Sequence, residues 1–205
     1  MNLLFCLLSF VFNTTAIAKE VAKMQLTIDK SIMETRQIPF KSHQGKKEFD
    51  NYLTMELPYA PVEKLLHDLE KKISKKLITR MEAHITVVTP IEYNHILSPI
   101  LSMNKIENIA KNLNIQNSPF KIKCLGKAQV NKDETYYLVV ESEALEKIRS
   151  QITKEFIMDR GPIGLFKPIK GYYPHITIGF TKRDLHIEDG VIKNEETCIA
   201  DVKVQ

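Results

Sequence analysis

Two stretches of the chain share one order of hydrophobic and polar patterns. Residues 52–57 alternate as a strand does, and a helical stripe of apolar residues follows them. A strand rich in β-branched residues then covers positions 83–88. The second stretch repeats this order with a strand over 135–141, a helical stripe that Ser142 caps, and a strand over 174–180. The repeat predicts two equivalent strand–helix–strand units.

Other elements surround these units. The apolar stripes consist of Val62, Leu65, Leu66, Leu69, Ile73 and Leu77 in the first unit and of Leu145, Ile148, Ile152 and Phe156 in the second. Further strands are expected near 24–28, 119–130 and 197–204, helices over 91–113, and irregular segments over 159–173 and 182–196. Together the patterns predict an α/β (α+β) fold. We expect one two-lobed domain over residues 19–205, whose pseudo-twofold units face each other across a central groove.

The last strand of each unit contains the tripeptide His-Ile-Thr. Because side chains alternate along a strand, His84 and Thr86 face one side, whereas Ile85 faces the other. His175 and Thr177 repeat this arrangement in the second unit. If the units face each other, the groove holds two imidazoles and two hydroxyls.

This set of groups suits the hydrolysis of a phosphodiester. One imidazole can take a proton from water and the other can protonate the leaving oxygen, because the histidine pKa lies near neutrality. The hydroxyls can stabilise the charge that develops on the phosphate. Neither histidine has a second ligand at the usual spacing, so we expect no metal and no cofactor. The alternative interpretation is a pair of buried structural histidines.

The doubled motif resembles the two-histidine (2H) phosphoesterase superfamily over about residues 50–181. The resemblance rests on both His-Ile-Thr strands, on Pro119-Phe120, on the strand over 135–141 and on the helix that follows it. The tail from Gly179 to His186, with Asp189-Gly190-Val191, further resembles the 2H domain of the Swiss-army-knife RNA-repair group.

The resemblance implies a two-lobed fold and a phosphoric diester hydrolase. His84 and His175 are then the acid and the base, and Thr86 and Thr177 hold the phosphate. The substrate is expected to be a nucleotide or an RNA end with a cyclic 2′,3′ or a 2′-5′ phosphodiester, and the protein is expected to be a monomer. Which histidine is the base, and whether a 2′- or a 3′-phosphate forms, stay open. The alternative function is a non-catalytic module that binds a nucleotide or an RNA end.

Aromatic and basic side chains in the loop before the second motif are further candidates for substrate binding. Tyr172, Tyr173 and Phe166 have rings that can stack on a base, or they pack the loop onto the sheet. Lys167 and Lys170 can attract a phosphate, or they form a solvated face. The net charge of +4 permits an anionic ligand without requiring one.

The first eighteen residues differ from the rest. They have no charged side chain, and an apolar stretch from Leu3 to Phe12 precedes Ala16-Ile17-Ala18. This pattern predicts a signal peptide cleaved after Ala18, and hence a secreted or periplasmic protein. The alternatives are an N-terminal helix or an uncleaved anchor, although the stretch is too short for an ordinary membrane span.

Cys124 and Cys198 lie in the part that would remain after cleavage. They could form a disulfide in an oxidising compartment or stay as free thiols. The composition, with 43% hydrophobic and 26% charged residues, is that of a globular protein. It excludes a disordered chain and a disulfide-dense mini-protein.

Overall fold

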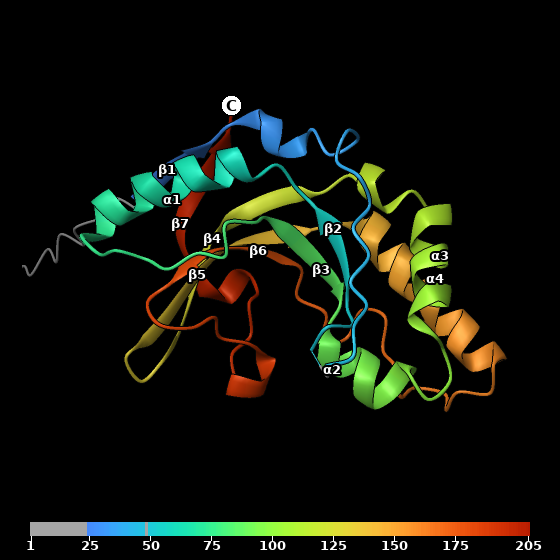
Figure 1. Cartoon of the computed structure of the whole chain (residues 1–205). Coiled ribbons are helices and arrows are strands. Elements are labelled where there is room, and N and C mark those ends of the chain that lie inside the picture. Colours follow the sequence, from blue (N-terminus) through green and yellow to red (C-terminus); the bar gives the residue numbers. More distant parts are fainter. Residues whose placement is uncertain (1–23, 48) are drawn as a thin grey trace, which may run out of the picture.

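The computed structural model describes residues 24–47 and 49–205 and contains two β-sheets (Figure 1). The larger sheet has the strand order β1-β7-β4-β5-β6, and the smaller one pairs β2 with β3. The strands are β1 (Met24–Ile28), β2 (Leu53–Glu56), β3 (His84–Val88), β4 (Lys121–Val130), β5 (Asp133–Glu141), β6 (His175–Phe180) and β7 (Cys198–Val204). The expected signal peptide lies outside the described residues.

Among the described residues, four α-helices accompany the sheets: α1 (Tyr59–Ile73), α2 (Pro90–Glu92), α3 (Met103–Asn112) and α4 (Glu143–Met158). A π-helical turn, Tyr93–Leu97, continues α2, and short 3₁₀ turns lie at Lys30–Met33, Ile115–Asn117, Ile187–Asp189 and Glu195–Thr197. Within the described part of the chain, no helix has both the length and the apolar character needed to cross a membrane. The mixed α+β architecture with two sheets confirms the expected fold class.

Both predicted units form, but they sit in sheets of different size. β2 pairs antiparallel with β3, and β5 pairs antiparallel with β6, each pair with a helix between its strands. The second pair is extended by β4, β7 and β1, because the long β4 pairs with β5 along almost its whole length. Ser142 caps α4 as predicted, since its hydroxyl accepts a hydrogen bond from the backbone N–H of Leu145.

One predicted helix ends earlier than its apolar stripe. α1 ends at Ile73 because Ser74 adopts a left-handed conformation with φ 52°. Leu77 therefore lies outside the helix, although the apolar stripe had predicted that it belongs to the helix. The next residue, Ile78, instead forms a bridge with Phe180 at the end of β6. This bridge ties the segment that leads into β3 to the larger sheet.

The two halves of the molecule are joined through helices and adjacent strands. α1 packs against β1 and β6 of the larger sheet, and α4 packs against α3 and β3. Figure 1 shows α1 beside the larger sheet and α3 and α4 beside the smaller one. β3 also contacts β6, so the two strands that carry His-Ile-Thr lie next to each other.

Strand β5 is buried on both of its faces. Leu138 and its alternate neighbours belong to the main hydrophobic core, whereas Tyr137 and Val139 belong to a second cluster with Leu185. Leu185 comes from the segment between β6 and β7, which we call the C-terminal loop (residues 181–197). This loop covers the face of the larger sheet on which Tyr137 stands.

A disulfide holds the end of the C-terminal loop in place. Cys124 of β4 and Cys198 at the start of β7 are bonded, with their Cα atoms 5.7 Å apart. The hydroxyl of Tyr137 also donates a hydrogen bond to Thr197, at 2.8 Å. The structure thus settles the question that the sequence left open in favour of the disulfide.

Candidate functional site

The two His-Ile-Thr strands have the same pattern of exposure. In β3, Ile85 and Val87 are fully buried, whereas His84 and Thr86 are partly exposed. In β6, Ile176 and Ile178 are buried and the histidine and threonine are again partly exposed. The predicted alternation therefore holds in both strands, because the isoleucines belong to the main core.

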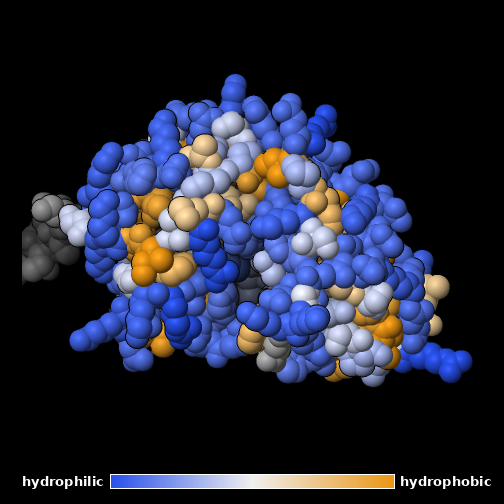
Figure 2. All heavy atoms as spheres, viewed as in Figure 1, coloured by the Kyte–Doolittle hydropathy of each residue, from blue (hydrophilic) through white to orange (hydrophobic). Residues whose placement is uncertain are grey.

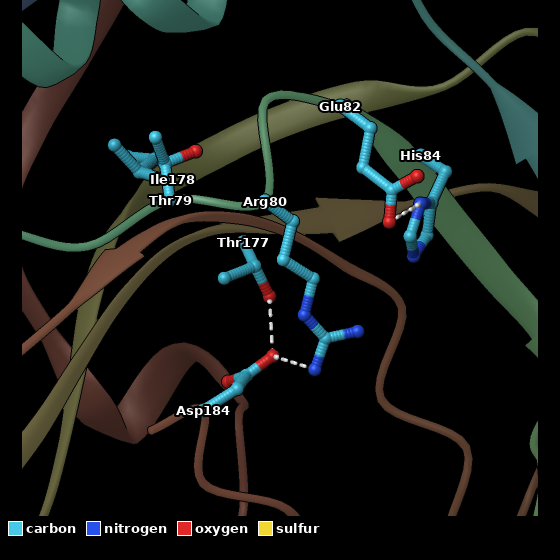
Figure 3. Close-up of a pocket in the computed structure, with 7 residues that line it drawn as sticks. All are labelled: Thr79, Arg80, Glu82, His84, Thr177, Ile178 and Asp184. Carbon is cyan, nitrogen blue, oxygen red and sulfur yellow. Dashed lines mark hydrogen bonds and ion pairs between the residues drawn. The ribbon is translucent and has the colours of Figure 1, made fainter. Parts of the chain in front are cut away.

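A cleft lies where these two strands meet the loops beside them (Figure 3). It is lined by Thr79, Arg80, Glu82, His84, Thr177, Ile178 and Asp184. One residue of each motif thus reaches the same cleft, although they are far apart in the sequence. Figure 2 shows that the face viewed there is mostly hydrophilic and is hollowed near its middle.

His84 contributes an imidazole with an acidic neighbour. Its Nδ1 lies 3.8 Å from a carboxylate oxygen of Glu82 (Figure 3), and it has no hydrogen-bond partner among the described residues. Burial lowers the pKa of His84, while Glu82 and Glu56 act in the opposite direction. The two carboxylates therefore favour the imidazolium that burial opposes.

His175 is held at both ring nitrogens. Nδ1 lies 2.7 Å from the backbone carbonyl oxygen of Tyr173, and Nε2 lies 3.1 Å from the ammonium of Lys193. A carbonyl oxygen only accepts, so Nδ1 carries the hydrogen, and the lone pair of Nε2 accepts from Lys193. Both contacts are satisfied by the neutral ring. Burial, followed by the charge of Lys193, lowers the pKa of His175 to about 3.

Asp184 connects the second motif to several cations. Its carboxylate accepts a hydrogen bond from the Thr177 hydroxyl at 3.2 Å and one from Lys193 at 3.1 Å. The guanidinium of Arg80 lies 3.7 Å from the carboxylate, and this ion pair is the dashed line between the two residues in Figure 3. Nε2 of His186 lies 3.9 Å from the carboxylate. Burial alone would raise the pKa of Asp184, but Lys193 and the histidines bring it below its usual range. Asp184 is therefore an anion flanked by two cations, Lys193 and Arg80.

A second polar network stands behind the first motif. Glu56 of β2 is buried and accepts a hydrogen bond from the Thr54 hydroxyl at 2.6 Å. Nε2 of His43 lies 3.3 Å from the same carboxylate. Thr54 pairs with Thr86 in the register of the smaller sheet, and Glu56 pairs with His84. The first motif is thus supported by β2, and Thr86 lies beside Thr54 rather than in the lining of the cleft.

The aromatic candidates of the loop before β6 pack around a buried arginine. The rings of Phe166 and Tyr172 lie 4.7 and 4.3 Å from the guanidinium carbon of Arg149. Tyr173 acts through its carbonyl, which holds His175. None of these three side chains lines the cleft.

The basic candidates of the same loop are exposed. The side chains of Lys167 and Lys170 point to solvent and are not part of the cleft lining. The backbone carbonyl of Lys167 accepts a hydrogen bond from Arg149 at 2.9 Å. Substrate binding by the side chains of this loop therefore stays a prediction.

Several residues of the site were not identified from the sequence. Arg80 and Glu82 precede β3, and Asp184 and Lys193 lie in the irregular C-terminal loop. Only Asp184 gave a signal, since it lies in the tail that resembles the Swiss-army-knife group. Among residues 24–47 and 49–205, no group of three or more His, Cys, Asp or Glu side chains is arranged to hold a metal ion.

Comparison with known families identifies one match. The model of the 2H-SAK family, described as "Swiss Army Knife, 2H phosphoesterase domain", matches residues 51–186. This segment contains both His-Ile-Thr strands, all residues that line the cleft, and Glu56. It ends before Lys193. No curated protein and no solved structure matches the chain significantly.

Proposed function

The chain belongs to the Swiss Army Knife 2H phosphoesterase domain family, and on that premise we propose that it hydrolyses a cyclic 2′,3′ or a 2′-5′ phosphodiester of a nucleotide or an RNA end. The family places the chain among the phosphodiesterases, which are phosphoric diester hydrolases. The finer proposal is that His84 and His175 act as acid and base without a metal. The observation that carries it is the cleft to which His84 and Thr177 both contribute.

The hydrogen bonds of the two imidazoles suggest different roles. His175 has its hydrogen on Nδ1 and its lone pair on Nε2, which is the form that a general base needs. His84 has Glu82 at 3.8 Å and Glu56 opposite it, and carboxylates favour the protonated form that a general acid needs. We therefore assign the base to His175 and the acid to His84.

The reaction follows from these roles. Nε2 of His175 takes a proton from water as the water oxygen forms its bond to phosphorus. The bond between phosphorus and the leaving ribose oxygen breaks, and His84 donates a proton to that oxygen. His175 is then protonated and His84 is neutral, and exchange with solvent restores both. The identity of the monophosphate product reports which ribose oxygen leaves.

Hydroxyl and guanidinium groups can stabilise the negative charge on the phosphate. Thr177 can donate a hydrogen bond to a non-bridging oxygen, and the half-exposed Arg80 supplies a positive charge at the cleft. Thr86, expected for the same task, lies beside Thr54 outside the cleft lining. Thr177 now donates to Asp184, so a bound phosphate would replace a carboxylate as its acceptor. The hydrogen bond to Asp184 keeps the Thr177 hydroxyl oriented before the substrate arrives.

We also propose that the protein works outside the reducing cytoplasm, as a secreted or periplasmic protein cleaved after Ala18. The disulfide between Cys124 and Cys198 supports this, because disulfides persist mainly in oxidising compartments. Mass spectrometry of the protein recovered from the periplasm or the medium tests it. A mature chain that starts at Lys19 is expected, and a full-length chain in the cytoplasm would contradict the proposal.

The function is tested by a panel of substrates in EDTA. The purified protein is incubated with 2′,3′-cyclic nucleotides, an RNA with a cyclic phosphate end and 2′-5′ oligoadenylate, and the products are separated by chromatography. Turnover of at least one of them is expected. Tight binding of a nucleotide without turnover of any of them would instead identify a binding module on the same fold.

A further inference from the structure

A buried lysine contacts the second histidine from outside the segment that the family model matches. Lys193 has only 4% of its surface exposed, and its ammonium lies 3.1 Å from both Nε2 of His175 and Oδ1 of Asp184. The same ammonium lies 5.2 Å from the centre of the Tyr137 ring. A lysine is rarely buried unless its charge is paired. The carboxylate of Asp184 pairs with the charge of Lys193 here.

The imidazole of His175 is faced by strand β5 and by the C-terminal loop. Tyr137 of β5 presents its ring to the imidazole at a centroid distance of 5.7 Å, in an edge arrangement. The C-terminal loop contributes Lys193 as a direct contact, and Asp184 and His186 act through their charges. The nearest cation among the described residues is therefore Lys193.

We propose that Lys193, held in place by Asp184, is a positioning residue that keeps His175 in the neutral Nδ1–H form with its lone pair on Nε2. The proposal rests on the proposed function, because it explains how this histidine is kept ready as a base. An ammonium that donates to Nε2 opposes the arrival of a proton there. The oxygens of an incoming phosphate are stronger acceptors than the imidazole, so the ammonium can turn to them and free Nε2 for water.

The surrounding structure fixes Lys193 in this place. The C-terminal loop is anchored on one side of Lys193 by Leu185, which is fully buried. On the other side it is anchored by the disulfide of Cys198 and by the hydrogen bond between Thr197 and Tyr137. Because the loop is fixed on both sides of Lys193, placing this side chain against His175 costs little additional conformational entropy.

The test follows the ring of His175 by NMR while the pH is changed from about 5 to about 8. The full chain is labelled at its histidines, and the signal of His175 is assigned by its absence in His175→Ala. In the wild type, we expect the Nδ1–H tautomer and no titration in this range. In Lys193→Met, which keeps the length of the side chain but removes its charge, we expect a protonated fraction that grows toward pH 5, because burial still lowers the pKa of His175 but the Lys193 charge no longer does.

Lys127→Met is the matched control. Lys127 also pairs with a buried carboxylate, that of Glu134 at 2.7 Å, and its ammonium also lies near a tyrosine ring, 5.8 Å from the centre of Tyr136. It has no contact with the cleft. The control variant should lose stability as Lys193→Met does, but the ring of His175 should stay neutral and silent.

Activity gives a second readout with a characteristic pH dependence. Removal of the Lys193 charge should raise the pKa of His175, although burial, the largest cause of the shift, still holds this pKa below its usual range. The rate of Lys193→Met should therefore fall more at pH 5 than at pH 8, because more of the His175 rings are protonated at the lower pH. A merely structural defect would lower the rate equally at both values.

The outcomes separate this inference from the proposed function. A wild-type His175 that titrates near pH 6.5 or carries its hydrogen on Nε2 would overturn the role of Lys193. A His175 ring in Lys193→Met that is no more protonated at pH 5 than in the wild type would overturn it as well. The wild-type tautomer tests the proposal even if the variant does not fold. Because the NMR titration needs no substrate, its result stands whether or not the substrate panel shows turnover.

Discussion

Glu56 lies directly opposite His84 in the antiparallel pair of β2 and β3. Residues paired in this way have their side chains on the same side of the sheet, so a carboxylate accompanies the imidazole of the first motif. The carboxylate of Glu56 is itself held by Thr54 and His43. Burial lowers the pKa of His84, and Glu56 is one of the charges that oppose this effect.

Replacement of Glu56 by Gln should therefore weaken the general acid. Without the carboxylate the pKa of His84 falls further, so the protonated form is lost at a lower pH. The alkaline limb of the kcat/KM profile should move to lower pH, and the rate at pH 7 should fall about two- to fivefold. Glu70→Gln is the control, since Glu70 of α1 is also buried but pairs with Lys76, which follows the helix. An alkaline limb that moves to higher pH would contradict the assignment of the acid.

The pH optimum of the wild type should be acidic. The base must be neutral, and the pKa of His175 is lowered to about 3, so its protonation reduces activity only near that pH. The acid must be protonated, and the pKa of His84 is lowered from 6.5, so activity declines as the pH rises through a value below 6.5. A profile of kcat/KM should therefore have its maximum below neutrality. A rate that still increases between pH 7 and 8 would refute these assignments.

Arg149 should be the side chain whose loss destabilises the fold most clearly. It is 1% exposed, and its guanidinium pairs with Glu92 at 2.7 Å. It also donates hydrogen bonds to the backbone carbonyls of Val87, Lys167 and Pro168. Arg149→Met leaves these acceptors and the carboxylate without their donor, so we expect a loss of about 3–5 kcal/mol in the free energy of unfolding. Urea denaturation measures it.

An exposed arginine provides the comparison. Arg183 forms a bidentate pair with Asp189, but half of its side chain is exposed to solvent. Arg183→Met should therefore cost much less stability than Arg149→Met. If both variants lost the same stability, the buried contacts of Arg149 would not stabilise the fold as proposed.

The disulfide should stabilise the protein and the C-terminal loop. Cys124 and Cys198 are 74 positions apart, and closing a loop of that size contributes about 2–4 kcal/mol. A reducing agent, or the double change Cys124→Ser and Cys198→Ser, should lower the melting temperature. Activity should fall as well, because the disulfide anchors the loop that carries Lys193. A titration that finds both thiols free in the native protein under oxidising conditions would contradict this account.

The local pattern of the chain was sufficient to predict most elements and both motifs. Alternation along a strand depends only on the pleat, so the partial exposure of His84 and His175 and the burial of Ile85 followed from the sequence. The early end of α1 did not follow, because Ser74 ends the helix while apolar residues continue to Leu77. The unequal size of the two sheets depends on long-range pairing, which no local pattern encodes.

The contacts within the site also depend on long-range pairing and could not be predicted from the local sequence. Lys193 is brought to His175 by the pairing of β7 with β4 and by the disulfide, which fixes the end of the C-terminal loop. A lysine in an irregular segment has no distinguishing pattern of neighbours in the sequence. Tyr172 and Phe166 were identified as candidate stacking groups, and their rings lie against Arg149, whose role became visible only in three dimensions.

The most direct test of the central claim is the rate of substrate turnover in EDTA for His84→Ala and His175→Ala, beside the wild type. His67→Ala is the control, since His67 is exposed on α1 and away from the cleft. Each of the first two changes should lower the rate about 10²–10⁴-fold, and the control should keep the wild-type rate. Wild-type turnover in either His84→Ala or His175→Ala would show that the paired histidines do not perform the reaction.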